Sequence, residues 1–492
     1  MLGRQERWQE DLFVAAPLRE LIPEDHILKR IDRILDLTWL RKEVEACYDT
    51  ALGRPGIDPE AALRLMLAGL FLGIAHDRKL MREAQVNIAI RWFAGYRLTE
   101  TLPNHSSLTR IRQRWGEERF EMIFRKTVQQ CLEAGLVRGD LVHVDATLIR
   151  ADVSWDSIVE RHLDEVKRVN DEGSDDDEPP SKDDGNGSSS SSSSRSVSRT
   201  KQVKKVSMTD PDATMATASN RFHMEPSYKQ HTAVDDTAGV ILDVHVTTGE
   251  RSEGQELEGQ LDRVEQSTGR KIQTVTADAG YAHGTNYAML EARLTESVIP
   301  PQRAATRKGR IPARRFKYDE KHHIVRCPKG KVLNRSSRDG QDQGWIYRST
   351  ARECKKCDLR DRCMAPSAKA RVIRIGDSHA SLLRARRSHA RWDARTKMLY
   401  SRHRWRAEGA HGEAKAQHGL HRATRRGTRN VRIQAYLTAA VQNLKRIANA
   451  LSHALRSWVW RGQFKTDRSV QCSWMVFALN PLASSDATLQ AA

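Results

Sequence analysis

The chain has 492 residues, with 82 Lys or Arg against 63 Asp or Glu, which gives a formal net charge of +19 at pH 7. A chain of this length exceeds the roughly 150 residues of one domain, so several domains are expected. The positive excess attracts polyanions, most commonly nucleic acid. The longest apolar run, 61–75, is too short to span a bilayer, and no secretory signal is visible. We therefore expect a cytoplasmic protein that does not bind membranes.

The first segment, 10–138, is expected to form an all-helical domain, because its apolar residues recur at helical spacing. Within it, Asn104 or Ser106 can cap the start of a basic helix. Such a helix suits DNA binding, and an ordinary basic helix of a bundle is the open alternative. The candidate DNA-binding residues on this helix are Arg110, Arg112 and Arg114.

Strand-like segments follow and then alternate with helices, which predicts an α/β fold with a mixed sheet flanked by helices. A helix is expected around Leu257, Leu261 and Val264. The segment 171–200 is acidic and serine-rich, which predicts a disordered insertion. The expected strands are 141–147, 229–234, 239–248, 272–277 and, more weakly, 297–300.

Four cysteines lie in a segment that we expect to be a small subdomain inserted into the α/β fold. A Cys-x2-Cys pair with a flanking cysteine on each side predicts a four-thiolate Zn2+ site, and reduced thiols without metal are the open alternative. These cysteines are Cys327, Cys354, Cys357 and Cys363. The expected division of the chain is 10–138 helical, 139–300 first part of the core, 301–380 cysteine-containing subdomain, 381–455 second part of the core, and 456–492 tail.

Two aspartates, Asp145 and Asp278, each follow a buried-type strand. Taken alone, each suits a turn or cap. For a third acid, Glu408 and Glu413 compete. At 100° per residue, Glu408 shares a helical face with Arg404 and Lys415, whereas Glu413 points about 180° away. The sequence therefore favours Glu408.

The segments His143-Val-Asp-Ala-Thr147, Ala277-Asp-Ala-Gly-Tyr281 and Arg404-x3-Glu408-x6-Lys415 together resemble the DDE transposases of bacterial insertion sequences. The resemblance extends over roughly 10–450. One departure is Ser401, which stands where the family usually has a tyrosine, with Tyr400 one residue early.

The resemblance implies a ribonuclease H-like catalytic core that cuts at the ends of an insertion sequence and joins them to target DNA. Asp145, Asp278 and Glu408 would bind two Mg2+ ions, or Mn2+, while Arg404 and Lys415 would contact phosphates. The expected partner is double-stranded DNA, and bringing two ends together implies a homodimer on DNA. A metal-dependent nuclease on the same fold, or a DNA-binding regulator that has lost catalysis, are the open alternatives.

Overall fold

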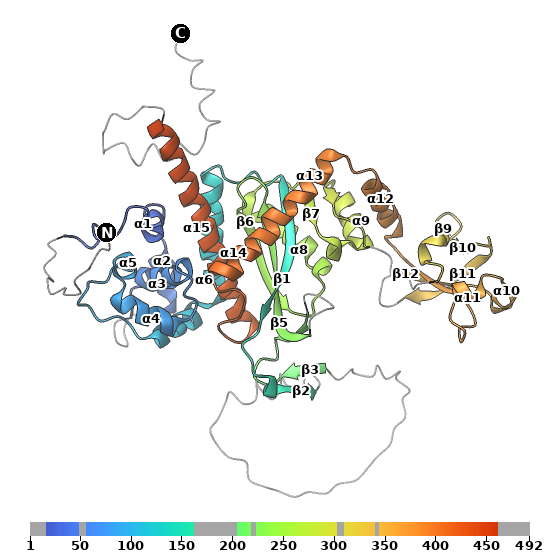
Figure 1. The fold of residues 1–492 in the computed structure, drawn as a ribbon, viewed down its shortest axis with the longest axis horizontal. Coiled ribbons are helices and arrows are strands. Elements are labelled where there is room, and N and C mark those ends of the chain that lie inside the picture. Colours follow the sequence, from blue (N-terminus) through green and yellow to red (C-terminus); the bar gives the residue numbers. More distant parts are fainter. Residues whose placement is uncertain are drawn as a thin grey trace, which may run out of the picture. The chain divides into compact units, whose positions relative to one another are not determined.

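A computed structural model describes residues 16–48, 56–161, 204–217, 223–302, 309–339 and 344–460 (Figure 1). The contacts divide the chain into two units. One comprises 1–136, 148–228 and 412–492, and the other comprises 137–147 and 229–411. The expected disordered insertion, 171–200, and the tail beyond residue 460 lie outside the described residues.

The first unit is mainly helical, as its apolar periodicity predicts. Asp58 accepts hydrogen bonds from the first amides of α3, and Pro59 occupies its first turn, where a missing amide hydrogen costs nothing. Asn104 caps α6 by accepting from Ser106 N at 3.0 Å, so of the two predicted caps Asn104 is the one used. The helices are α1 Ile27–Asp32, α2 Leu40–Val44, α3 Pro59–Phe71, α4 Asp77–Val86, α5 Ile88–Phe93, α6 His105–Glu133, α14 Gly409–Gln417, which begins just before this unit, and α15 Thr428–Trp460.

The two longest helices of this unit, α6 and α15, pack against each other. Phe124 of α6 stacks on Tyr436 of α15 with ring centroids 6.1 Å apart. A short antiparallel ladder joins β2 (Ile158–Arg161), β3 (Lys204–Ser207) and β4 (Thr214–Ala216). In the described residues, no helix is long and apolar enough to cross a membrane.

The second unit is built on a sheet whose strands follow the order β6, β5, β1, β7, β8. Strands β1 and β7 are parallel, as are β7 and β8. This bears out the expected mixed α/β architecture, and the five predicted strands correspond to these five. Their bounds are β1 Leu141–Arg150, β5 Glu225–Asp235, β6 Ile241–Thr248, β7 Thr274–Ala277 and β8 Glu296–Val298.

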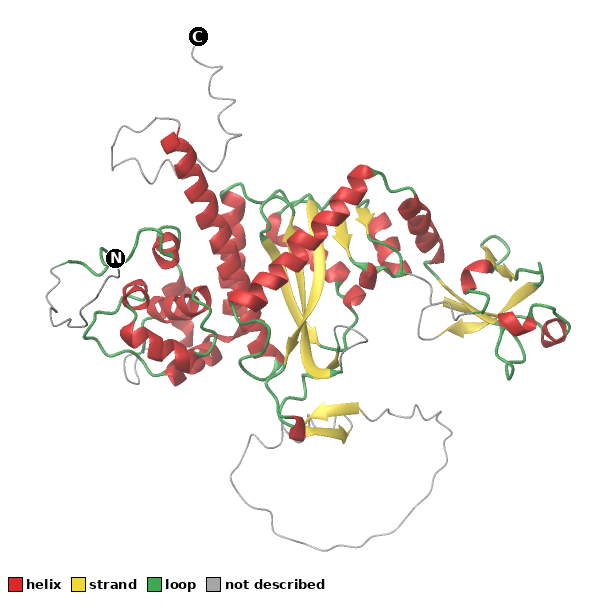
Figure 2. Ribbon diagram, viewed as in Figure 1, coloured by secondary structure: helices red, strands yellow, loops and turns green. Residues whose placement is uncertain are grey.

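Helices flank this sheet in Figures 1 and 2. Helix α8 packs against β6, and α13 packs against β7. Leu257, Leu261 and Val264 are all buried on one side of α8, as their spacing predicts. The helices are α8 Leu257–Thr268, α9 Gly284–Ala292, α12 His379–Ala390 and α13 Ala394–His403.

A second, antiparallel sheet lies between β8 and α12 in the chain, with strand order β13, β12, β11, β10, β9 (Figure 2). It has an apolar cluster of its own, which includes Phe316, Leu333 and Tyr347. The strands are β9 Lys317–Asp319, β10 Ile324–Arg326, β11 Val332–Asp339, β12 Gly344–Arg348 and β13 Val372–Gly376, and two short helices, α10 Ala351–Lys355 and α11 Arg360–Cys363, accompany them.

Candidate active site

The register of two parallel strands places Asp145 and Asp278 next to each other. Val144 of β1 pairs with Ala277 of β7. Asp145 directly follows Val144 in the chain, and Asp278 directly follows Ala277. Since side chains alternate across a sheet, residues that follow paired positions in parallel strands point to the same face. The expectation that β1 ends at Asp145 is wrong, because the strand continues to Arg150. Asp145 therefore projects from within a strand, which holds its backbone on both sides.

The two aspartates have different electrostatic surroundings. Burial raises the pKa of Asp278, and the nearby charge of Asp145 raises it further. The amide of Gly280 partly offsets this by donating to Asp278 Oδ1 at 2.8 Å. Burial also acts to raise the pKa of Asp145, but His411 and His403 outweigh it and lower the pKa. His411 Nδ1 lies 3.4 Å from Asp145 Oδ2. Asp145 thus stays ionised more easily than its neighbour.

Glu408 stands on a distorted turn. Residues Arg404–Glu408 form a π-helical segment between α13 and α14, so the uniform 100° rotation assumed from the sequence does not apply there. The Glu408 side chain is 58% exposed and pairs with Arg404 at 3.5 Å. Burial raises the pKa of Tyr400 and lowers that of His403, and the charges of Glu408, Asp145 and Asp278 act to raise both. Glu408 thus acts on the same two side chains as Asp145 and Asp278.

Glu413, the competing third acid, is held in a buried network. Its carboxylate accepts from Lys445 Nζ at 2.5 Å and from Arg446 Nη2 at 2.6 Å, both on α15. Burial alone would raise the Glu413 pKa, but the hydrogen bonds from His418, Arg446 and Lys445 hold it well below its ordinary value. These ion pairs join α14 to α15, so Glu413 stabilises the packing of the two helices.

A chain of buried polar side chains, not expected from the sequence, runs beside the aspartates. His143 Nε2 lies 3.0 Å from Asp236, and His143 Nδ1 lies 2.6 Å from Thr276 Oγ1. Thr276 Oγ1 in turn lies 3.1 Å from His403 Nδ1. Burial lowers the pKa of both histidines. One feature of the sequence could have predicted this network. His143 lies two residues before Asp145, and Thr276 lies two residues before Asp278, so each pair shares a face of its strand.

Glu253 and Tyr281 are two further residues that the sequence did not single out. Glu253 lies in the turn before α8. Burial raises the pKa of its carboxyl group, and the charges of Asp278 and Asp145 raise it further. The Tyr281 hydroxyl is fully buried and has no hydrogen-bond partner among the described residues. No sequence spacing links Glu253 to the aspartates, whereas Tyr281 is visible as the third residue after Asp278.

The basic residues predicted to bind DNA differ in their surroundings. Arg404 is 82% exposed, and Lys415 is half-buried in α14. Arg110 and Arg114 are exposed on α6, and Arg114 lies over the Tyr48 ring. Arg112 differs from the expectation, because it is buried and makes two hydrogen bonds to Asp77, at 2.7 and 3.0 Å. Arg112 shares Asp77 with Arg425 inside the helical unit, so it is not on the surface that DNA could reach.

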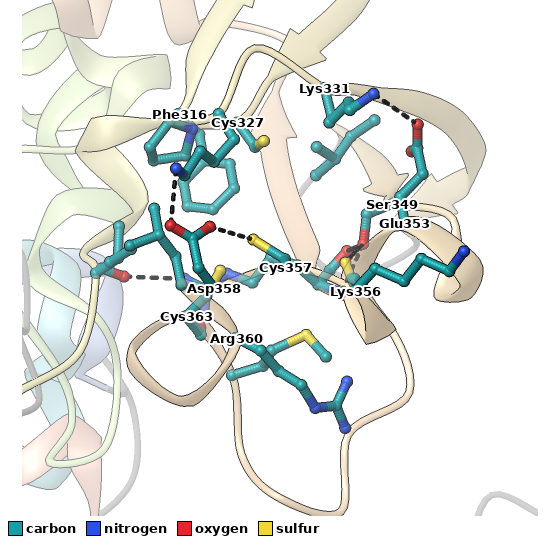
Figure 3. Close-up of a pocket in the computed structure, with 18 of the residues that line it drawn as sticks. Phe316, Cys327, Lys331, Ser349, Glu353, Lys356, Cys357, Asp358, Arg360 and Cys363 are labelled. Carbon is teal, nitrogen blue, oxygen red and sulfur yellow. Dashed lines mark hydrogen bonds and ion pairs between the residues drawn. The ribbon is translucent and has the colours of Figure 1, made fainter.

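The four clustered cysteines line one cavity of about 440 Å3 in the small antiparallel sheet (Figure 3). Ser349 Oγ lies 2.9 Å from Cys354 Sγ, and Cys357 faces Asp358. Burial raises the pKa of the Cys363 thiol, and the three other cysteines raise it further. The thiols are thus neighbours, but across the described ranges no three His, Cys, Asp or Glu side chains lie close enough to hold one metal ion. The predicted zinc site is therefore not supported.

Among the described residues, Asp145, Asp278 and Glu408 also do not lie close enough together to hold one metal ion. Their chemistry nevertheless fits a hard divalent cation, which prefers carboxylate oxygens. Burial and mutual repulsion raise the pKa values of Asp278 and Glu253, and a nearby positive charge would relieve this repulsion. The convergence of Asp145, Asp278 and Glu408 stays a prediction.

Comparison with protein families gives two matches. Residues 16–114 match a family model described as Transposase domain (DUF772). Residues 326–448 match a model described as Transposase DDE domain, and this range contains Glu408, while Asp145 and Asp278 lie before it. No curated protein matches the chain. The two transposase models, one toward each end of the chain, support a DDE transposase of an insertion sequence.

Proposed function

We propose that this transposase cuts DNA at the ends of its insertion sequence and joins them to target DNA by metal-dependent phosphoryl transfer. The observation that carries the proposal is the parallel register that sets Asp145 beside Asp278. Two acids from adjacent parallel strands supply hard oxygen ligands on rigid backbone. We propose a ribonuclease H-like arrangement for this core.

Asp145, Asp278 and Glu408 are the proposed ligands of two Mg2+ or Mn2+ ions. When bound, such ions activate the attacking oxygen and stabilise the leaving oxygen. Glu408 can turn toward the aspartates at little cost, since an exposed ion pair such as that with Arg404 contributes only about 0.2–1 kcal/mol. The carboxylates position the cations, and the protein's basic residues position the DNA.

Arg404 and Lys415 are proposed to bind phosphates of the transposon end. The Arg404 guanidinium is exposed and can form a bidentate pair with phosphate oxygens. Arg110 and Arg114 of α6 are proposed to bind elsewhere on the double-stranded DNA, and Arg112 is not included because Asp77 holds it. We propose a homodimer on DNA, because two ends must meet before joining.

The test uses duplexes made from both borders of the DNA segment that carries the gene. Wild type is expected to cut them in Mg2+ and to join a pre-cut end to a second duplex. Asp145→Asn, Asp278→Asn and Glu408→Gln should each abolish both reactions and leave DNA binding intact. Glu258→Gln removes a charge from an exposed position of α8 and is the matched control.

Three results would count against parts of this proposal. Cutting without joining of a pre-cut end would make the protein a nuclease. Binding without cutting by wild type would make it a regulator. Wild-type cutting by Glu408→Gln would remove Glu408 from the site.

A further inference from the structure

Glu253 lies in the short 3-10 turn Glu253–Gln255, η3 in the chain order, between β6 and α8. Its side chain is 27% exposed, and its carboxylate lies 3.4 Å from Lys229 Nζ on β5. Lys229 also donates to the carbonyl oxygen of Arg251 at 2.9 Å, which leaves only part of its hydrogen-bonding capacity for Glu253. Lys229 is thus shared between the Glu253 carboxylate and a backbone carbonyl.

The position of Gly280 shows how close Glu253 comes to the aspartates. A Cβ atom placed on Gly280 would lie 2.5 Å from Glu253 Oε2 and 2.9 Å from Asp278 Oδ1. The two carboxylate oxygens therefore face the same small volume above the Gly280 backbone. Only a residue without a side chain leaves this volume open.

Asn286 holds the two turns at this separation. Its buried amide donates to the carbonyl oxygen of Gly254 at 2.9 Å and to that of Tyr281 at 3.0 Å. Gly254 follows Glu253, and Tyr281 ends the turn that begins after Asp278. One side chain thus fixes the backbone of both acids, so their proximity is built into the fold.

A second observation at the same place is the buried, unpartnered hydroxyl of Tyr281. Tyr281 is 0% exposed. Burial raises the pKa of its hydroxyl group most, and the charges of Asp145, Glu253 and Asp278 raise it further. A buried hydroxyl without a partner costs about 1–3 kcal/mol, so its retention beside three carboxylates points to a polar ligand in this volume.

We propose that Glu253 is a further carboxylate of the divalent-cation site, positioned on the Asp278 side, where it accepts hydrogen bonds from water bound to the cation. Mg2+ keeps several waters when one or two carboxylates bind it directly, so an outer carboxylate has donors to accept from. Glu253 is a positioning residue, and Lys229 competes with the cation for it. The inference rests on the proposed catalytic role of Asp145 and Asp278.

The test measures Mn2+ binding to the full-length protein without DNA, from the electron paramagnetic resonance signal of free Mn2+. Loss of an outer partner typically weakens metal binding about 10–100-fold, so Glu253→Gln should raise the Kd by at least about tenfold. Lys229→Met should lower the Kd, because it releases Glu253. Glu258→Gln should bind as wild type, and thermal melts check that each variant is folded.

The outcomes separate the two proposals. If Asp145→Asn weakens Mn2+ binding but Glu253→Gln binds as wild type, Glu253 has no part in the site and the catalytic proposal stands. Should Asp145→Asn itself bind as wild type, the cation site proposed around the aspartates is wrong. A merely structural Lys229–Glu253 pair would lower the melting temperature in both variants without opposite shifts in Kd, which would also overturn the inference.

Discussion

Asp145 and Asp278 come from strands 133 residues apart in the chain, yet the pairing of Val144 with Ala277 makes them neighbours on one face of the sheet. Because Asp145 lies within β1, it cannot shift without disturbing the ladder, and Asp278 directly follows the paired residue Ala277 at the end of β7. The fold thus fixes two of the proposed ligands rigidly and leaves Glu408, on an exposed π-helical turn, as the adjustable one.

Gly280→Ala tests the crowded volume between the carboxylates. The added methyl would meet Glu253 and Asp278 at the far ends of their side chains, which can move aside, so stability should change little. Displacing these oxygens should weaken Mn2+ binding and slow cleavage at least tenfold. Gly259→Ala on α8 is the control, because a Cβ atom placed there would lie 3.4 Å from the Arg263 side chain, an ordinary contact. It should leave Mn2+ binding and cleavage unchanged. Equal behaviour of the two variants would contradict the crowding argument.

Tyr281→Phe tests the unpartnered hydroxyl. Removing it relieves a buried, unsatisfied group, so the free energy of unfolding without metal should stay the same or rise by up to about 1–3 kcal/mol. The stabilisation gained on adding Mn2+ should become smaller than in wild type. Chemical denaturation with and without Mn2+ measures both quantities, and a clear loss of stability without metal would show that the hydroxyl already has a partner.

Glu413→Gln should act on folding rather than on catalysis. Glu413 is paired with Lys445 and Arg446, and breaking a buried pair by removing one partner costs about 3–5 kcal/mol. The folded-state pKa of Glu413 is depressed, so its contribution is present above the unfolded value of 4.5 and is lost as the pH falls below it. The difference in unfolding free energy between wild type and variant should therefore shrink below about pH 4.5. A constant difference down to pH 2 would contradict this assignment.

Arg404→Ala should weaken DNA binding and reduce its salt dependence. Removing one phosphate-binding cation lowers the slope of log K against log salt by about 0.9. Arg112→Ala is the contrasting variant, because Arg112 is bound to Asp77 inside the helical unit. It should lower the unfolding free energy, by about 1–3 kcal/mol, and leave the salt slope unchanged. Fluorescence anisotropy across a salt series distinguishes them, and a slope change for Arg112→Ala alone would reverse the assignment.

The sequence predicted the elements of the core well, because β1 and β7 are short apolar runs and the apolar residues of α8 recur at helical spacing. It also identified Asp145 and Asp278 as candidates, but not the register that joins them, which depends on pairing between distant segments. Arg112, a candidate DNA-binding residue, is instead buried, because it pairs with Asp77, 35 residues away in the chain. Glu253 was invisible because only tertiary contacts at Gly280 and Asn286 bring it to the aspartates.

The preference for Glu408 over Glu413 came from an ideal helical rotation that the π-helical turn does not follow. In the structure Glu413 is paired with Lys445 and Arg446, and the choice of Glu408 stays a prediction. The exposure of Glu408 could not have been read from spacing alone. Local periodicity thus identified the residue types, while tertiary ion pairs decide which carboxylate is available.

The most direct test of the metal-dependent site is anomalous X-ray diffraction from Mn2+ bound to the protein in complex with its transposon-end DNA. We predict Mn2+ peaks within coordination distance of Asp145, Asp278 and Glu408, with Glu253 in the surrounding shell of water. Peaks bound by Glu413 in place of Glu408, or no Mn2+ between Asp145 and Asp278, would contradict the account.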